Sequence, residues 1–475
     1  MQKSHISAPC FWVLGFWVLA LALVAFPTMA ASPAKSTFTF RSQRRPANTD
    51  RVTARLEVGG ETNYTTEGKP QHEKMSVECN LEYFEKTLEI PSGGEAVWRS
   101  VRDYQKVKAD VKVGDGQFQP SLQPPHHLIA VEAAKPTALL FSPQGNLTRD
   151  ELDAIDIQAN SLLLDRLLPE KPVAVGDAWP HAAELMAAML GLDEVAKTTV
   201  QSTLREVTPT VARFVLGGQV EGTIYGVSTK IEIRGKYRFD LRSKRIDWLG
   251  MLIKEERRGS FVDDGLDVVS RLQMMIVPAE EPASLAAAAL AKLTLKPTPD
   301  LLLLAYQSPG GGWRCTYDRR WYLHYDRPKT SVVKLRLVDH GTPAGQCILS
   351  SLPERDPDKL VSLEEFQEDV RRALGKSFGE FVEASKSSNA ANYRVYRVVV
   401  HGTASDIAMR WIYYLVADPQ GRRAAFTFTV EQSLVERFAD ADKAMVQSLR
   451  FPEVKETAGT HHGDTEKKEK PGKGK

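Results

Sequence analysis

Residues 231–241 read Ile-Glu-Ile-Arg-Gly-Lys-Tyr-Arg-Phe-Asp-Leu, with apolar and polar side chains in alternation on either side of a glycine. Successive side chains of a β-strand point to opposite faces of a sheet. This period of two therefore predicts a strand with one face on a core and the other in water. The same period recurs at residues 77–83 and 107–113. We therefore expect strands over most of residues 37–142 and again over residues 200–277.

Two helices are expected between these groups of strands. Thr148 and Glu151 have the spacing of a capping box, which predicts the start of a helical stretch that ends before Pro169. A second helix is predicted over residues 181–198. Between them, residues 168–180 contain prolines and Trp179. We interpret this segment as a rigid surface turn in which Trp179 packs, in preference to a binding segment.

A second domain is expected after residues 279–299, a segment rich in alanine and proline that is typical of a linker. The domain, residues 300–452, combines strand patterns with two amphipathic helices. We expect strands at 313–317, 321–325, 331–338, 346–350, 393–401, 407–417 and 423–430, and helices at 362–382 and 434–449. Ser362 with Glu365, and Ser433 with Glu436, have capping-box spacing. A tight hairpin turn is expected at residues 418–421.

Grouped strands with helices packed on them predict an α+β fold. The prediction is a curved, antiparallel, β-rich domain with two helices at residues 37–278, and an antiparallel sheet with packed helices at residues 300–452. In residues 423–451, the strand Phe-Thr-Phe-Thr-Val leads into a capped helix that ends Ser-Leu-Arg-Phe. This order resembles the PsbP-like α/β sandwich of exported and photosystem-associated proteins. The N-terminal block resembles, in general shape, the half-barrels of exported lipoprotein carriers. Neither resemblance implies a catalytic residue.

The first 30 residues have the pattern of a secretory signal. Lys3 precedes an uncharged apolar run at residues 11–26, and Thr-Met-Ala at 28–30 supplies the small residues of a cleavage site. The run has 16 residues, fewer than the ~20 of a membrane-spanning helix. We expect a cleaved signal, a periplasmic or extracellular location and no membrane segment afterwards, with an uncleaved anchor as the alternative. Residues 453–475 are polar and lysine-rich, which predicts a disordered tail.

Charge and cysteine content restrict the possible partners. The chain has 62 basic and 60 acidic residues, so its charge gives no reason to expect a nucleic acid as partner. Cys79, Cys315 and Cys347 remain after signal removal. In an oxidising compartment cysteines pair by default, and a disulfide between Cys315 and Cys347 is the first choice. Cys79 is then expected to be a small buried apolar residue.

Motifs for catalysis, cofactors and metals give no candidate. The patterns GxSxG and HExxH are absent. His126 and His127 follow two prolines and are interpreted as part of a loop, and residues 263–267 as a hairpin turn in preference to a calcium loop. Asp339 and His340 near Cys347 are interpreted as a turn. Four aromatic residues of the second domain could hold a flat ligand, but we expect them to pack in the core instead. They are Trp313, Trp321, Tyr322 and Tyr325.

The sequence therefore favours an exported protein without catalytic activity. We expect it to bind a partner protein or an apolar ligand, or to have a structural role in the envelope, and we expect no cofactor. A hydrolase with an unrecognised active site is the alternative. The two differ in what a structure would contain: an apolar pocket in the first case, and a cleft with converging Asp, Glu, His or Ser side chains in the second.

Overall fold

The structure is a computed structural model. It describes residues 36–66, 69–91, 97–133, 138–224, 226–258, 265–308, 312–327, 332–339, 342–359 and 361–452. The predicted signal and the predicted C-terminal tail lie outside these residues, as do Asp263, Asp264 and His340 of the motifs discussed above.

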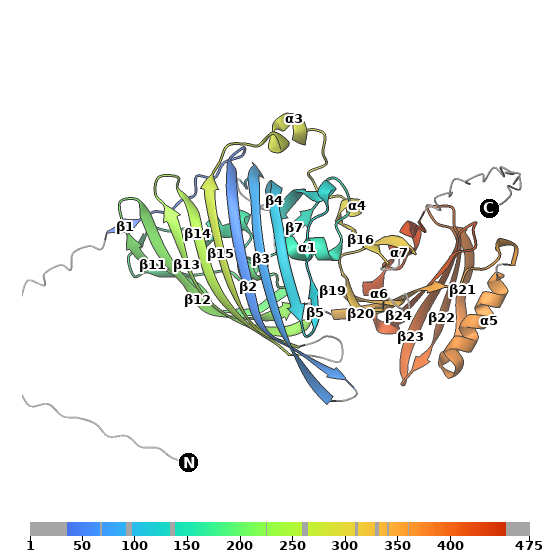
Figure 1. The fold of residues 1–475 in the computed structure, drawn as a ribbon. Coiled ribbons are helices and arrows are strands. Elements are labelled where there is room, and N and C mark those ends of the chain that lie inside the picture. Colours follow the sequence, from blue (N-terminus) through green and yellow to red (C-terminus); the bar gives the residue numbers. More distant parts are fainter. Residues whose placement is uncertain are drawn as a thin grey trace, which may run out of the picture. The chain divides into compact units, whose positions relative to one another are not determined.

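A large antiparallel sheet contains thirteen strands of the described residues (Figure 1). In spatial order they are β7 (Ala138–Phe141), β6 (Leu128–Ala133), β4 (Trp98–Val113), β3 (Lys69–Glu89), β2 (Thr49–Thr66), β15 (Gly265–Pro278), β14 (Arg245–Arg257), β13 (Val227–Asp240), β12 (Val211–Ile224), β11 (Gln201–Val207) and β9 (Ala178–Pro180). Two further strands join at the side: β5 (Gly116–Phe118) pairs with β4, and β10 (Glu194–Thr198) pairs with β12.

The two faces of this sheet differ in burial because the side chains alternate along each strand. In β13, Ile231, Ile233, Tyr237 and Phe239 are buried, whereas the residues between them are partly or fully exposed. The strand predicted from residues 231–241 is therefore confirmed. We call the buried side the inner face and the opposite side the outer face.

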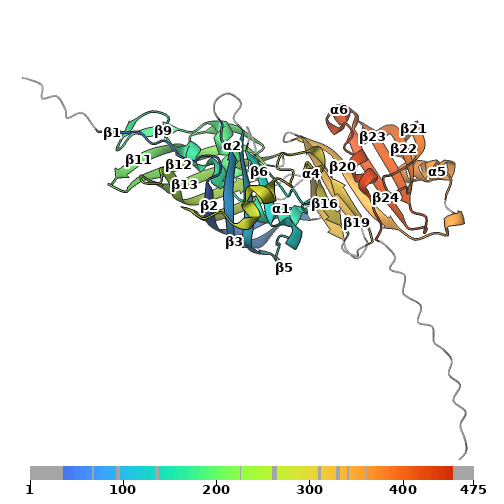
Figure 2. The ribbon, with the colours of Figure 1, turned by 90° about the horizontal axis from the view of Figure 1, so that it is seen from above.

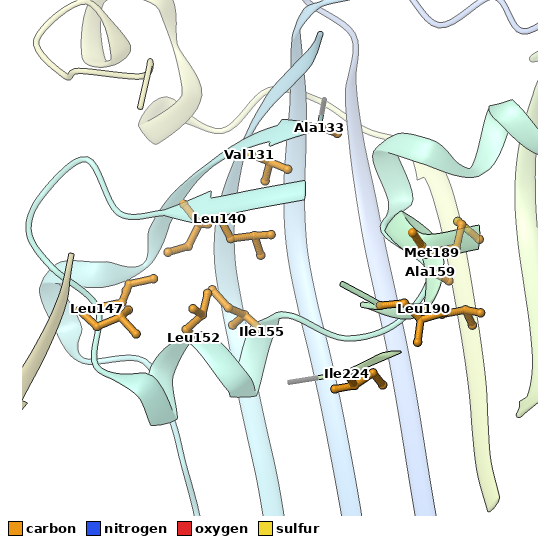
Figure 3. Packing of buried hydrophobic residues seen from close by; sticks show 14 of the residues in the cluster. Val131, Ala133, Leu140, Leu147, Leu152, Ile155, Ala159, Met189, Leu190 and Ile224 are labelled. Atoms are coloured by element: carbon orange, nitrogen blue, oxygen red, sulfur yellow. The ribbon is translucent and has the colours of Figure 1, made fainter. Parts of the chain in front are cut away.

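Short helical segments cover the inner face: α1 (Arg149–Ile155), the 3-10 helix η2 (Ser161–Leu167) and α2 (Ala183–Leu190). Leu152 and Ile155 of α1 lie beside Leu140 of β7, and Met189 and Leu190 of α2 lie near Ile224 of β12 (Figure 3). All of these side chains belong to the apolar core. The core of this part of the chain thus lies between the sheet and the segments on its inner face.

A second antiparallel sheet contains seven strands of the described residues (Figure 2). They are β18 (Trp321–Arg327), β19 (Val332–Asp339), β20 (Thr342–Leu352), β24 (Arg423–Glu431), β23 (Ile407–Ala417), β22 (Arg394–Ala404) and β21 (Phe378–Ser388). The helices near it are α5 (Leu363–Leu374), α6 (Val435–Phe438) and α7 (Lys443–Ser448). Residues 418–421 form the predicted turn between β23 and β24, where the Gly421 amide donates to the Asp418 carbonyl.

Smaller elements complete the described chain. They are β1 (Thr37–Phe38), η1 (Pro124–His126), β8 (Val173–Ala174), η3 (Ala283–Leu285), α3 (Ala287–Leu290), α4 (Pro299–Leu302), β16 (Leu304–Gln307), β17 (Arg314–Tyr317), η4 (Pro357–Lys359), η5 (Gly375–Ser377) and η6 (Gln432–Leu434). None of the helices in the described residues is both long enough and apolar enough to cross a membrane.

The prediction of an α+β fold is wrong. Strands make up 56% of the described residues and helical segments 17%, so the protein is mostly β, with large antiparallel sheets and few helices. The error arises from helix length. Each predicted helix exists in part, but the chain leaves the helical conformation early.

Residues with a positive φ end two of the helices that were predicted too long. Gly191 has φ +70° and ends α2, after which residues 194–198 form β10. Gly375 has φ +52° and follows α5, so that residues 378–388 form β21. A left-handed residue cannot continue a right-handed helix.

Two other predicted helices are divided. The capping box of Thr148 and Glu151 is confirmed, but α1 ends at Ile155 and the next helical turn begins only at Ser161. The closing helix is split at Ala439, which has φ +47°. Its predicted capping box at Ser433 is also wrong, because α6 has Leu434 at its N-cap with no side-chain bond. The capping box of Ser362 and Glu365 is confirmed.

Candidate ligand-binding site on the inner face

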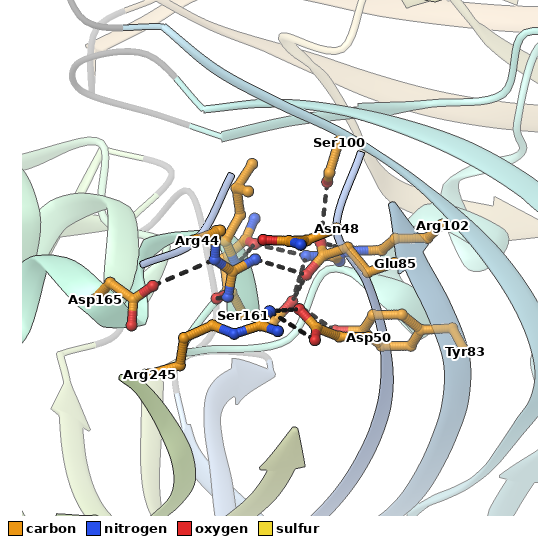
Figure 4. A network of polar contacts seen from close by, with 12 residues as sticks. Arg44, Asn48, Asp50, Tyr83, Glu85, Ser100, Arg102, Ser161, Asp165 and Arg245 are labelled. Carbon is orange, nitrogen blue, oxygen red and sulfur yellow. Dashed lines mark hydrogen bonds and ion pairs between the residues drawn. The ribbon is translucent and has the colours of Figure 1, made fainter. Parts of the chain in front are cut away.

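Five buried charged residues and the partly buried Arg245 gather on the inner face of the large sheet (Figure 4). This charge cluster consists of Arg44, Asp50, Glu85, Arg102, Asp165 and Arg245. It contains three arginines and three carboxylates, so it is neutral as a group. Burying an unpaired charge is very costly, and pairing offsets part of that cost.

Glu85 of β3 lies at the centre of the charge cluster. Its Oε1 accepts from Arg102 Nε at 2.9 Å and from Ser100 Oγ at 2.9 Å. Its Oε2 accepts from Ser161 Oγ at 2.8 Å and lies 3.6 Å from Arg44 Nη1. The carboxylate is thus fully engaged, and it joins two strands to η2 and to the segment before β2.

Asp165 of η2 holds the N-terminal segment against the sheet. Its Oδ2 accepts from Ser42 Oγ at 2.7 Å and from Arg44 Nε at 3.2 Å, and its Oδ1 accepts from the Ile246 amide at 3.3 Å. Arg44 also donates to the Ser161 carbonyl at 3.2 Å. Segments that are distant in the sequence therefore meet at one carboxylate. These contacts fix the N-terminal segment, which leads into a neighbouring cavity.

The electrostatics of the charge cluster keep Glu85 ionised. Burial alone would raise its pKa, but Arg102 and Arg44 outweigh burial, so the pKa of Glu85 lies below its ordinary value. Asp50 differs: burial outweighs Arg245 and Arg44 and raises the pKa of its carboxyl. Glu85 is therefore the carboxylate whose charge the cluster stabilises most clearly.

A cavity of about 910 Å³ opens beside the charge cluster. It is surrounded by residues 40–42, the end of η2, the segment 168–180 and the start of α2. Its apolar lining includes Phe40, Leu168, Pro169, Val173, Trp179 and Leu185, and its polar lining includes Arg41, Asp165, Arg166, Glu170, Lys171 and Asp177. The volume lies in the range of small-molecule pockets, roughly 300–1,000 Å³. We call this space the inner-face cavity.

Trp179 fixes one wall of the inner-face cavity. Its indole Nε1 donates to the Leu167 carbonyl at 3.0 Å, and its ring packs edge-on against Phe214 with centroids 5.8 Å apart. The prediction that Trp179 packs agrees with this placement, although Trp179 lies in the strand β9 and not in a turn. The same segment, residues 168–180, also supplies much of the cavity wall, so it contributes to the candidate site.

His181 lines the cavity but is itself buried, with 6% of its surface exposed. Its Nε2 lies 2.7 Å from Ser202 Oγ, and burial lowers the pKa of His181 to about 4. Ser202 has no exposed surface. A serine nucleophile must reach its substrate, and this one is sealed behind its histidine. Ser202 and His181 are therefore as close as a nucleophile and its base, but a substrate cannot reach the serine.

A second close pair, His126 and Glu151, is also occupied by structural contacts. His126 Nδ1 lies 2.8 Å from Glu151 Oε1. The same carboxylate accepts from the Gln123 amide and from the Thr148 amide of the capping box. His127 is partly exposed instead, and its Nδ1 lies 3.1 Å from the Pro124 carbonyl. The two adjacent histidines thus take different partners, and within the described residues no three His, Cys, Asp or Glu gather as a metal site.

The disulfide predicted between Cys315 and Cys347 is not present in the structure, which has both cysteines as free, buried thiols. Cys315 lies in β17 and Cys347 in β20, strands of different sheets. Burial raises the pKa of Cys315 to about 12 and that of Cys347 well above its ordinary value. Cys79 is also buried, and its thiol donates to the Ala154 carbonyl at 3.6 Å.

The aromatic residues considered as a flat-ligand site lie mainly in the core. Trp313 and Trp321 are fully buried, and Trp321 packs against Phe428 and Phe438. The Arg149 guanidinium carbon lies over the ring of Tyr322, 4.8 Å from the ring centroid. Trp313 and Trp321 thus have the expected packing role. The side chain of Tyr325 lies outside what the structure describes.

No residue of the charge cluster was predicted from the sequence. A signal was nevertheless present: the alternation Val77, Cys79, Leu81, Tyr83 continues two residues further to Glu85. A charged residue at the inward period of a strand predicts a buried partner of opposite charge. The partners themselves come from distant segments, so their identity requires the fold.

No protein-family model matches the chain, and no curated protein matches it. Among solved structures, the cyanobacterial PsbP of Synechocystis is 14% identical, with a TM-score of 0.25 over 32% of this chain and 92% of that chain. The translocator domain of the autotransporter NalP from Neisseria meningitidis is 7% identical, with a TM-score of 0.11 over 82% and 90%. A BenF-like porin from Pseudomonas fluorescens is 8% identical, with a TM-score of 0.11 over 80% and 97%. The resemblance to PsbP is thus a distant one.

Proposed function

We propose that the protein is an exported binding protein without catalytic activity, whose inner-face cavity holds a ligand with an apolar body and a polar end. The observation that carries the proposal is the cavity of about 910 Å³, lined by apolar side chains on one part and charged side chains on another. Binding pockets for small molecules are mostly apolar and contain a few polar groups that fix the orientation of the ligand.

The polar lining supports a ligand with one polar end. Arg41, Glu170 and Lys171 are exposed at the cavity, whereas Phe40, Val173 and Leu185 are buried. A ligand that placed its apolar body against the buried residues would keep its polar end near the exposed charges and in water. This arrangement avoids burying an unpaired polar group.

The absence of catalysis is supported by the state of the nearby titratable groups. Asp165 is engaged by Ser42, Arg44 and the Ile246 amide. Ser202 is sealed behind His181. A catalytic site needs groups that are free to exchange protons with a substrate, and these two are committed to the fold.

The exported location rests on the sequence pattern of residues 1–30. A protein of the periplasm or the extracellular space meets lipids and other amphiphiles of the envelope, which are ligands of the chemistry proposed. A partner protein that inserts an apolar side chain into the cavity is the second occupant that the lining would accept.

Native mass spectrometry of protein purified from its own host tests the proposal, together with displacement of anilinonaphthalene sulfonate, a probe with an apolar body and an anionic end. The full chain is compared with Ala182→Trp, which places a large ring in the cavity lining, and with Ala182→Ser as the matched control. We expect a co-purifying ligand and probe binding in the wild type and Ala182→Ser, and at least tenfold weaker binding in Ala182→Trp. Equal binding by all three proteins would contradict the proposal.

A further inference from the structure

A second surface with recognition chemistry lies on the outer face of the large sheet, around Trp248 of β14. Two depressions, of about 270 and 440 Å³, lie on this face, and both are lined by Trp248 and Gln273. One extends over β2 and β3, with Arg55 and Asn80 in its lining, and the other extends over β13. Since they share two residues, they form one groove across the strands, which we call the outer-face groove.

The groove exists because of a bulge and a glycine. The pairing of β13 with β14 skips one residue, so that Arg238 pairs with Trp248 and Phe239 with Ile246. A bulge of this kind re-aims the side chains beside it. At Gly250, a Cβ atom would lie 2.7 Å from Cη2 of Trp248. The outer edge of the indole ring therefore lies over the glycine, where a side chain would displace it, and the ring forms an aromatic platform on the sheet.

Polar side chains continue from this platform across the strands. Register pairs Lys236 with Gly250, Gly250 with Gln273, Gln273 with Arg55, and Arg55 with Asn80. Neighbouring strands lie about 4.8 Å apart. The groove thus offers one hydrogen-bonding side chain per strand, except at Gly250, where the aromatic ring takes its place.

The charge of the groove is positive. Its charged lining residues are Arg55, Lys106, Arg234, Lys236, Arg271 and Glu82. Glu82 is paired with Arg51, and Lys106 and Lys236 form no ion pair with another described residue. Cations still outnumber carboxylates when Glu57 and Glu232, which pair with the arginines, are counted. Exposed ion pairs of this type are weak, so the arginines remain available to an anionic ligand.

We infer that the outer-face groove binds an acidic polysaccharide, with a sugar ring stacked on Trp248. An indole face accepts the C–H groups of a sugar ring, Gln273 and Asn80 bind hydroxyls, and the lysines and arginines bind carboxylates. The repeat of one polar group per strand is close to the length of one sugar ring. This site is separate from the inner-face cavity and its ligand.

Two other occupants fit the observations less well. A peptide strand adds to a sheet through unpaired backbone groups at an edge, whereas Trp248 lies on strands that are paired on both sides. A membrane surface is bound by side chains that project into it. Trp248 is only partly exposed and its ring edge lies against Gly250, so it does not project.

Affinity electrophoresis of the full chain through gels that contain polygalacturonate tests the inference, with dextran gels as the neutral comparison. We expect retardation by polygalacturonate alone. Trp248→Ala should weaken binding about tenfold, and Trp248→Phe should retain most of it, because stacking contributes about one power of ten. Lys106→Ala with Lys236→Ala should weaken binding and reduce its dependence on salt.

The control is Val277→Ala, an exposed apolar residue of the outer face outside the groove lining, which should bind as the wild type does. Equal retardation of Trp248→Ala and wild type would overturn the inference. So would equal retardation by dextran, or binding to vesicles of phosphatidylglycerol in place of the polysaccharide. Circular dichroism of each variant confirms folding, and probe binding in the inner-face cavity should be unchanged in Trp248→Ala.

Discussion

The two faces of the large sheet are built from the same strands but treat charge in opposite ways. On β3, Glu85 points to the inner face and has no exposed surface, whereas Glu82 points to the outer face and pairs with the exposed Arg51. On β15, Met274 is 2% exposed and its neighbour Met275 is 48% exposed. A step of one residue thus moves a side chain from core to solvent.

This difference separates stability from recognition. In the charge cluster of the inner face, charges are balanced and paired, so they join segments of the fold. In the outer-face groove, cations exceed carboxylates and are exposed, so they are available to a ligand. The same residue types therefore have different roles, and the environment set by strand alternation decides which role applies.

The largest effect is expected for Glu85→Gln. It leaves Arg44 and Arg102 buried without their shared carboxylate, which should lower the free energy of unfolding by about 3–5 kcal/mol. Glu82→Gln, on the same strand, should change it by less than about 1 kcal/mol. Urea unfolding of both variants measures the difference. Similar losses for the two would show that the charge cluster does not contribute as its burial indicates.

The two methionines of β15 give the next comparison. Met274→Ala should cost about 2–5 kcal/mol, because a cavity forms in a packed core. Met275→Ala should stay within about 0.5 kcal/mol of wild type, since its side chain is exposed. Thermal unfolding of both variants under one condition suffices, and a cost for Met275 as large as that for Met274 would refute the assignment of the faces.

The smallest effect concerns the pH dependence contributed by His181. Its pKa in the folded chain is about 4, below its value of 6.5 when unfolded. Above pH 6.5 both states are neutral and stability is unaffected. As the pH falls from 6.5 to 4, the unfolded chain binds a proton that the folded chain does not, so stability declines by roughly 2–3 kcal/mol. In His181→Gln, urea unfolding at pH 7, 5.5 and 4.5 should show a smaller decline. An unchanged decline would locate the effect elsewhere.

Strands were predicted well from the sequence because their period is a local property. The alternation at residues 231–241 gives the buried set of β13 directly. Helix lengths were predicted less well. Phe378 and Phe381 continue the apolar spacing of α5 but belong to β21, and they still pack in the same apolar cluster as Phe366 and Val370. A strand after a left-handed glycine brought them to the place where a longer helix would have put them.

The candidate site could not be predicted because its parts are assembled by the fold. Ser42, Asp165 and Ile246 meet at one carboxylate although long stretches of sequence separate them. The residues of β14 contain no signal for the bulge before Trp248. The sequence therefore did not indicate the recess over Gly250. Long-range pairing and local irregularity are both invisible to periodicity.

The pairing of β2 with β15 has a kinetic consequence. These two strands lie side by side in the middle of the sheet, with Asp50 opposite Pro278, and the ion pair of Asp50 with Arg245 spans 195 positions. The sheet therefore cannot be completed until nearly 280 residues of the chain have emerged. Closing so long a loop makes folding slow, as in other proteins dominated by non-local contacts. If the chain is exported as proposed, such a delay is an advantage, since its first strands remain without their central partner until the last one arrives.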